Sequence, residues 1–186
     1  MKIVVAITGA SGSIYAQRLL KVLSEGDHEI HVALSSHAEE VAAVEIGGYQ
    51  FAKNLFVVGD KSMQVPFVSG SAKFDVMVIV PCSMGTVGRI AHGYSDSTIT
   101  RAADVFLKEK RKLILVPRET PWNLIQARNI VSLLEAGAVM LPAIPSFYHR
   151  PQTLDEVADT VVARILDQMG IPHALVKRWK EEDRKD

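Results

Sequence analysis

The first 24 residues constrain the fold more than any other stretch. Five apolar residues run without alternation from Ile3 to Ile7, which is the pattern of a strand buried on both faces of a parallel sheet. A small, hydroxyl-rich segment follows over 8–13, and a helical pattern then extends over 14–24. Such a strand, glycine turn and helix start form an anion site, because the free N–H groups and the helix dipole favour negative charge.

The spacing of the glycines narrows the ligand. Gly9 and Gly12 match only part of the G-x-G-x-x-G dinucleotide pattern, and the second expected strand, 29–34, ends in Ser35-Ser36 rather than in an acidic residue. No Gly-Lys-Ser/Thr follows, so a P-loop is excluded. The turn therefore predicts a phosphate or another polar group of a mononucleotide. The alternative is a turn that only packs the helix on the strand.

Composition limits the classes of protein. A chain of 186 residues predicts a single domain, 1–186, with a C-terminal tail over 171–186. The 48% of hydrophobic residues indicates buried subunit surface, and we expect Trp179, in a polar tail, to pack on a neighbouring subunit. A net charge of zero lacks the footprint of a nucleic-acid-binding protein. No apolar run is long enough to cross a membrane, so we expect no membrane partner.

Cysteine and histidine usage limits the chemistry further. The single cysteine, Cys82, excludes an intrachain disulfide and favours a cytoplasmic location. Without a neighbouring histidine or lysine, this thiol is interpreted as a buried, inert group. The six histidines are scattered over different elements, so no metal site is expected.

The rest of the chain alternates strands and helices, which predicts an α/β protein with a parallel sheet. Strands are expected at 55–58, 76–80, 113–116 and 139–141, and helices at 36–46, 98–110, 121–136 and from 154 to about 169. Thr120 as N-cap and Pro121 at the first position are expected to start the third of these helices. Thr153 and Glu156 predict a capping box before the last one.

Polar residues follow two further buried strands. Ser83, Met84, Gly85 and Thr86 come after 76–80, and we expect them to meet the first turn at one crevice. The pair Arg118-Glu119 follows 113–116, where a charged pair favours function over packing. Glu45 lies in the last turn of a helix, where the dipole disfavours a carboxylate, and the alternative is a plain surface residue.

Several stretches, in this order and at these spacings, resemble the UbiX-type flavin prenyltransferases. They are Thr8-Gly9-Ala10-Ser11-Gly12, Ser35, Glu45, Pro81-Cys82-Ser83-Met84-Gly85-Thr86, Arg101-Ala102-Ala103-Asp104-Val105 with Leu107-Lys108-Glu109, Leu115-Val116-Pro117-Arg118-Glu119, Phe147-Tyr148-His149-Arg150-Pro151-Gln152 and Val162-Ala163-Arg164-Ile165-Leu166. The resemblance covers nearly the whole chain and is weakest over 49–72.

The resemblance implies a three-layer Rossmann-like, or flavodoxin-like, subunit in a homo-oligomer, typically a dodecamer. It implies transfer of a dimethylallyl group from dimethylallyl monophosphate to N5 and then C6 of reduced FMN, without a metal. The prenylated FMN would pass to a UbiD-type decarboxylase. Members of this family were formerly described as carboxy-lyases.

The resemblance also assigns residues. FMN would contact Gly9, Ala10, Ser11, Ser35, Ser83, Met84, Gly85, Thr86 and Arg101. The substrate phosphate would be held by Lys108, Arg118, Tyr148 and Arg164, with Glu119 as its proton donor. Glu45 would act as a base in ring closure, and Ser11 would join the catalytic set.

Two other functions stay open on the residues alone. A flavin-dependent decarboxylase of peptidyl cysteine shares the general subunit fold but needs no quartet of phosphate ligands. A non-catalytic flavin carrier has no need of a charged pair after a buried strand. The set Lys108, Arg118, Tyr148 and Arg164 argues against the decarboxylase, and the charged pair Arg118-Glu119 argues against the carrier.

Overall fold

Six parallel strands form one sheet in the order β3-β2-β1-β4-β5-β6. The computed structural model describes residues 1–177, so Trp179 and the contact expected of it lie outside the described residues. The strands are β1 (Lys2–Ile7), β2 (Glu29–Leu34), β3 (Leu55–Gly59), β4 (Val76–Cys82), β5 (Lys112–Pro117) and β6 (Val139–Met140). This strand order is that of the Rossmann fold.

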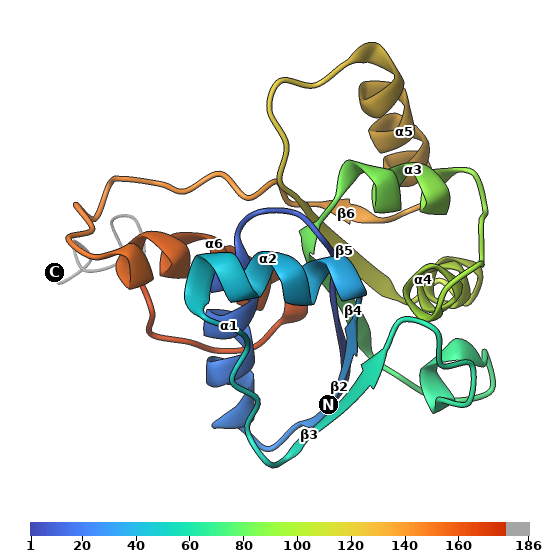
Figure 1. Cartoon of the computed structure of the whole chain (residues 1–186), viewed down its shortest axis with the longest axis horizontal. Coiled ribbons are helices and arrows are strands. Elements are labelled where there is room, and N and C mark those ends of the chain that lie inside the picture. The colour runs from blue at the N-terminus through green and yellow to red at the C-terminus, as the bar shows by residue number, and fades with distance from the viewer. Residues whose placement is uncertain (178–186) are drawn as a thin grey trace, which may run out of the picture.

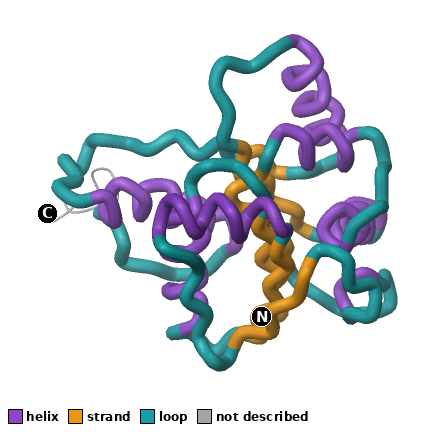
Figure 2. The backbone as a smooth tube through the Cα atoms, viewed as in Figure 1, coloured by secondary structure: helices purple, strands orange, loops and turns teal. Residues whose placement is uncertain are grey.

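Helices cover both faces of the sheet (Figures 1 and 2). One face carries α1 (Ser13–Ser24) and α6 (Leu154–Met169), and the other carries α3 (Met84–Ala91), α4 (Thr98–Lys108) and α5 (Leu124–Glu135). The helix α2 (Ser36–Ile46) packs on α1, and a 3-10 turn, η1 (Pro66–Val68), packs on α4. The predicted three-layer parallel α/β architecture is confirmed.

The apolar run of β1 is continuous because each of its side chains enters a core. Ile3, Val5 and Ile7 lie in the core beneath α1 and α6, whereas Val4 and Ala6 lie in the core beneath α3 and α4. All five are fully buried. A strand between two helix layers has no solvent-facing side, so the alternation of an exposed strand is absent.

The order in which strands are added to the sheet reverses at β1. This strand pairs with β2 on one side and β4 on the other, with Ile3 in register with both Ile30 and Val76. In open α/β sheets, a ligand binds in the crevice outside the carboxyl ends of the strands at such a point. The two polar turns that follow β1 and β4 therefore share one edge of the sheet, as the sequence predicted.

The expected start of the helix over 121–136 is wrong. Helix α5 begins at Leu124, with Asn123 as its N-cap, and not at Thr120 and Pro121. The side chain of Asn123 accepts a hydrogen bond from the Gln126 amide, and the Gln126 side chain accepts one from the Asn123 amide. This capping box satisfies two free donors, whereas a helix start at Pro121 would leave the Asn123 and Gln126 side chains without these partners.

Three smaller differences concern element ends. Helix α3 was not predicted, because its eight residues with two glycines give a weak helical pattern. Helix α4 ends at Lys108 rather than Lys110, which adopts a positive φ of 54°. At the start of α6 the Thr153 hydroxyl accepts a hydrogen bond from the Glu156 backbone N–H, as the predicted capping box requires. The Glu156 carboxylate, however, accepts the backbone N–H of Gln152 rather than that of Thr153.

Candidate active site

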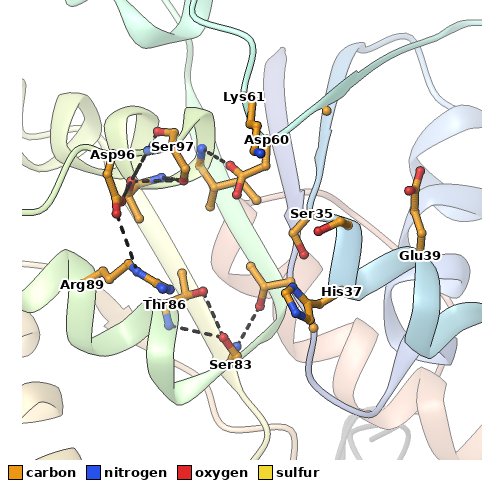
Figure 3. Close-up of a pocket in the computed structure, with 16 residues that line it drawn as sticks. Ser35, His37, Glu39, Asp60, Lys61, Ser83, Thr86, Arg89, Asp96 and Ser97 are labelled. Atoms are coloured by element: carbon orange, nitrogen blue, oxygen red, sulfur yellow. Dashed lines mark hydrogen bonds and ion pairs between the residues drawn. The ribbon is translucent and has the colours of Figure 1, made fainter.

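The largest of three cavities at the carboxyl edge of the sheet has a volume of about 620 Å³. Figure 3 shows the side chains around it, which come from the turns after β1, β2, β3 and β4 and from the start of α4. Its lining is mostly hydroxyl-bearing or charged: Thr8, Gly9, Ser35, Ser36, His37, Glu39, Gly59, Asp60, Lys61, Ser83, Thr86, Arg89, Asp96, Ser97, Ile99 and Thr100. We call it the hydroxyl cavity. Its volume is in the range of small-ligand pockets.

Three helices begin at the hydroxyl cavity, each with a serine cap. Ser35, Ser83 and Ser97 are the N-caps of α2, α3 and α4, and each hydroxyl accepts a backbone N–H at 3.2 Å. Figure 3 shows these serines on different sides of the same space. The positive ends of three helix dipoles therefore converge with several hydroxyl donors, which is a donor set suited to a phosphate.

Thr8 ties the two central turns together. Its hydroxyl donates to the carbonyl of Pro81 at 3.0 Å and accepts the backbone N–H of Ser83 at 2.8 Å. Gly9 comes next, and a Cβ at this position would collide with Cβ of His37 on α2. Glycine is thus required here by the close approach of α2, which brings the Ser35 cap within reach of the first turn.

A second cavity of about 400 Å³ lies on the other side of the β1–α1 turn. Apolar side chains dominate its wall, and a carboxylate and a guanidinium are its charged groups: Ser11, Gly12, Ile14, Tyr15, Glu45, Ile46, Arg118, Ala143, Leu154, Val157 and Ala158. We call it the apolar cavity. Arg118 Nε donates to the Ser11 carbonyl at 3.1 Å, which holds the guanidinium against the turn.

Glu45 occupies the anion site that the sequence predicted at the start of α1. Its carboxylate accepts the backbone N–H groups of Gly12 at 2.9 Å and Ser13 at 2.8 Å. Burial raises the pKa of Glu45, but hydrogen bonds from the Ser11 hydroxyl and from these amides outweigh it and lower the pKa below the usual value. Glu45 is exposed in one copy of the chain, and its carboxylate is a charged acceptor of two backbone N–H groups at neutral pH.

A third cavity, of about 490 Å³, continues from the apolar cavity past Arg118 and Ala143. Glu119 and Trp122 line it, and the Trp122 indole N–H donates to the Glu119 carbonyl at 3.0 Å. The Glu119 carboxylate accepts the backbone N–H of Thr120 at 3.1 Å. Arg118 and Glu119 thus face adjoining cavities at the end of β5, where the sequence predicted a functional pair.

Seven predicted site residues line none of these three cavities in the described chain, and four of them lie in ion pairs or in an exposed loop. Arg101 donates to the Val68 carbonyl at 3.2 Å and pairs with Asp104 at 3.0 Å, and Lys108 pairs with Glu109. Arg164, with 64% of its side chain exposed, pairs with Asp167 at 2.7 Å. Tyr148 is 76% exposed in the loop between β6 and α6.

Lys108 and Arg118 lie at opposite ends of the sheet. Lys108 ends α4, four residues before β5 begins, and Arg118 follows the last residue of β5. Six strand residues at about 3.3 Å each span roughly 20 Å. One copy of the chain therefore cannot close both side chains on a single phosphate.

The remaining predicted residues lie near the cavities without lining them. Ala10 is half-buried in the β1–α1 turn. Met84 is the buried first residue of α3, and Gly85 is exposed on the same helix. Cys82 is fully buried, and burial raises the pKa of its thiol, which fits the inert role expected of it.

Sequence reasoning missed part of the hydroxyl cavity. Asp60 and Lys61 come from the stretch 49–72, which gave no clear pattern, and the Asp60 carboxylate accepts the Ile99 amide at 2.8 Å. Ser97 comes directly before the expected helix 98–110, where an N-cap would stand, but its place at the cavity depends on where α4 starts relative to β1. The available signal was the repetition of a serine after a strand or before a helix.

Residues 1–177 contain no helix with both the length and the apolar character that a bilayer crossing requires. Over the same residues, no three His, Cys, Asp or Glu side chains gather into a potential metal site.

The Rossmann strand order and a cavity lined by helix N-termini at the switch point are typical of nucleotide-binding α/β proteins. A family model described as Flavoprotein matches residues 1–170. The flavin prenyltransferase UbiX of Methanocaldococcus jannaschii is 44% identical over 183 residues, covering 96% of this chain and 98% of that protein. The chain belongs to the UbiX flavin prenyltransferase family of flavoproteins.

Solved structures agree with this assignment. AnUbiX (PadA1), in complex with FMN and dimethylallyl pyrophosphate, gives a TM-score of 0.91 at 37% identity over 96% of both chains. A dodecameric FMN-dependent UbiX-like decarboxylase from Escherichia coli O157:H7 gives a TM-score of 0.90 at 39% identity, covering 96% of this chain and 99% of that one.

Proposed function

We propose that the protein is a transferase that joins the dimethylallyl group of dimethylallyl monophosphate to N5 and C6 of FMN. The observation that carries this proposal is the pair of cavities on either side of the β1–α1 turn. One offers three helix N-termini to a phosphate, and the other offers an apolar wall with Glu45 and Arg118. A mononucleotide and an apolar allylic group can therefore meet at the same turn.

The hydroxyl cavity is proposed to hold FMN. Its donor set of serine and threonine hydroxyls and helix N-termini fits a phosphate monoester, and a flavin in reduced form supplies the nucleophile. The residues that we assign to FMN contacts are Gly9, Ala10, Ser11, Ser35, Ser83, Met84, Gly85, Thr86 and Arg101. Of these, Gly9, Ser35, Ser83 and Thr86 line the hydroxyl cavity in one copy of the chain. The likeness to AnUbiX, whose structure contains FMN, supports the assignment.

The apolar cavity and its neighbour are proposed to hold the prenyl phosphate. Ile14, Leu154 and Val157 give the allyl group an apolar wall, while Arg118 can bind the phosphate in a bidentate manner. As the C–O bond breaks, charge develops on the departing phosphate. Lys108, Arg164 and the Tyr148 hydroxyl would stabilise that charge, and Glu119 would donate a proton to it, without a need for Mg²⁺.

Glu45 and Ser11 are proposed to act on the acceptor side. The Ser11 hydroxyl lowers the pKa of Glu45, so the two form one hydrogen-bonded unit beside the turn. A charged carboxylate there can accept the proton that must leave C6 when the new ring closes. This assigns a base to the transfer.

The proposed enzyme is a homo-oligomer. Because Lys108 and Arg118 lie at opposite ends of the sheet in one copy, a phosphate site that uses both needs a second copy. Leu124, Ile125, Ile144 and Leu154 are each at least 65% exposed, which is apolar surface typical of an interface. The dodecameric relative supports a dodecamer, and we propose a UbiD-type decarboxylase in the cytoplasm as recipient of the product.

The decisive experiment is anaerobic incubation of the protein with reduced FMN and dimethylallyl monophosphate, followed by mass spectrometry of the flavin. We expect a flavin heavier by one dimethylallyl unit, and a parallel reaction with the pyrophosphate tests the donor. An unchanged flavin with both donors would overturn the proposal. Carbon dioxide released from a cysteine-ending peptide would favour a decarboxylase, and neither product would favour a carrier.

A further inference from the structure

The turn Ser69-Gly70-Ser71 is held against the C-terminal end of α4 through its backbone. Arg111 donates from Nη2 to the Gly70 carbonyl and from Nη1 to the Ala72 carbonyl, both at 2.7 Å. In Figure 1 the segment that contains η1 lies beside α4. Two hydrogen bonds from one guanidinium fix the path of the turn independently of its side chains.

Gly70 lies directly under the side chain of Lys108. A Cβ on Gly70 would lie 2.7 Å from Nζ of Lys108 and closer still to Oε1 of Glu109. The backbone of Gly70 does not adopt a positive φ. A side chain is therefore disfavoured here by the lack of space beneath Lys108 and Glu109, and not by backbone conformation. Both crowded atoms are the ends of flexible side chains, so an added methyl group would displace them and leave the fold intact.

The ion pair of Lys108 and Glu109 rests on this bare backbone. A side-chain hydrogen bond from Lys108, together with the charges of Lys108 and Arg111, holds the pKa of Glu109 below its usual range. The carboxylate therefore stays charged and keeps the ammonium over the turn. Without a Cβ beneath them, the two groups can lie flat against residue 70.

We propose that Gly70 is a positioning residue for Lys108, and that the turn sets where the ammonium meets a phosphate monoester. The inference rests on the proposed function for its substrate, dimethylallyl monophosphate. Its geometry concerns the ammonium alone and applies to any phosphate bound there. The expected consequence of a side chain at position 70 is loss of phosphate affinity, with flavin binding unchanged.

A double-mutant cycle tests this proposal in the oligomeric protein. We expect Gly70→Ala to raise KM for dimethylallyl monophosphate about tenfold, the effect of weakening one charge-assisted hydrogen bond. FMN affinity and the melting temperature should match the parent. In a Lys108→Ala background, where turnover is lost, the added Gly70→Ala should change the affinity for inorganic phosphate less than about twofold, because residues that act as a unit are not additive. Ser71→Ala, in the same turn, is the matched control.

Binding of inorganic phosphate by calorimetry separates this inference from the proposed function. If the parent binds phosphate and Gly70→Ala weakens it only when Lys108 is present, the inference holds even if no prenylated flavin forms. Parent-like phosphate binding and KM in Gly70→Ala would overturn it. Additive losses in the double variant, or a Gly70→Ala protein with a lowered melting temperature or lost FMN, would also overturn it, since Gly70 would then act on the fold.

Discussion

Arg18 of α1 binds both carboxylate oxygens of Asp159 on α6, at 2.9 and 2.6 Å. The two side chains are 18% and 9% exposed, so little water competes for either group. This pair joins α1, which follows the β1–α1 turn, to α6, whose first residues line the apolar cavity. Its strength decides how firmly the wall of that cavity is held.

We expect Asp159→Ala to destabilise the protein by roughly 3 kcal/mol, because it leaves a largely buried guanidinium with only the exposed Asp155 as a charged partner. The double variant Arg18→Met with Asp159→Leu should recover most of that loss. Asp155→Asn, which alters the 60% exposed partner of the same arginine, should cost less than about 1 kcal/mol. Urea unfolding at neutral pH measures all three. A parent-like midpoint for Asp159→Ala would contradict the expectation.

Ser83 separates a capping role from a ligand role. Ser83→Ala should lower stability by about 1 kcal/mol, whereas Ser83→Gly should cost only a few tenths, because glycine is a tolerated N-cap. If the hydroxyl also binds the flavin phosphate, FMN affinity should fall to the same extent in both. Thermal unfolding and FMN titration give the two readouts. An affinity that follows stability instead would show that Ser83 is a cap alone.

Glu45 should make stability depend on pH. Its pKa in the folded protein is lowered from an ordinary 4.5, so the charged form stabilises the fold above that value. This contribution is lost as the pH falls through the lowered folded value. Glu45→Gln should therefore be less stable than the parent at pH 7, and the difference should shrink as the pH falls below 4.5. Urea midpoints across that range test this, with Glu40→Gln of the same helix as control.

Glu119 and Tyr148 should affect turnover without affecting FMN. Both are assigned to the departing phosphate, and removing one such donor costs roughly a hundredfold in rate. Glu119→Gln and Tyr148→Phe should bind FMN as the parent does and yield little prenylated flavin. Glu135→Gln and Tyr94→Phe are matched controls at exposed positions. Should the first two variants lose FMN instead, they are flavin ligands and the assignment must be redrawn.

Mixing inactive variants tests whether the site is shared between copies. Lys108→Ala and Arg118→Ala should each be inactive, but mixed oligomers contain sites that take an intact Lys108 from one copy and an intact Arg118 from another. Random exchange in a symmetric assembly restores roughly a quarter of the sites. Activity should rise after joint refolding, while sedimentation confirms the oligomer. No recovery in verified mixed oligomers would show that both residues serve one copy.

The buried strands and their polar ends were predictable because each is encoded locally. The run from Ile3 to Ile7 specifies a strand between two helix layers, and Ser83 or Arg118 stands out directly after such a run. The Glu45 contact was not predictable, since Gly12 lies 33 residues away and nothing local places the end of α2 over the β1–α1 turn. Thr120 and Pro121 were a plausible helix start that lost to the reciprocal bonds of Asn123 and Gln126.

The separation of Lys108 from Arg118 was also hidden. Lys108 precedes β5 and Arg118 follows it. Only the direction of β5 shows that the two residues lie at opposite ends of this strand. Likewise, Ser97 had a cap signal, but its convergence with Ser35 and Ser83 depends on strand order. The local sequence pattern predicted the helices and strands themselves, but not which of them lie next to one another.

Three of the four cations assigned to the ligands lie beside carboxylates of their own helices or turns, and the fourth, Arg118, donates to the Ser11 carbonyl. Arg101 pairs with Asp104, Lys108 with Glu109 and Arg164 with Asp167. Together with a net charge of zero, these pairs leave little positive potential beyond a Debye length, which is about 8 Å at physiological ionic strength. A phosphorylated substrate is therefore not steered to this surface from a distance. Its capture is decided at contact, where its phosphate must replace a carboxylate, and the rate of encounter depends little on salt.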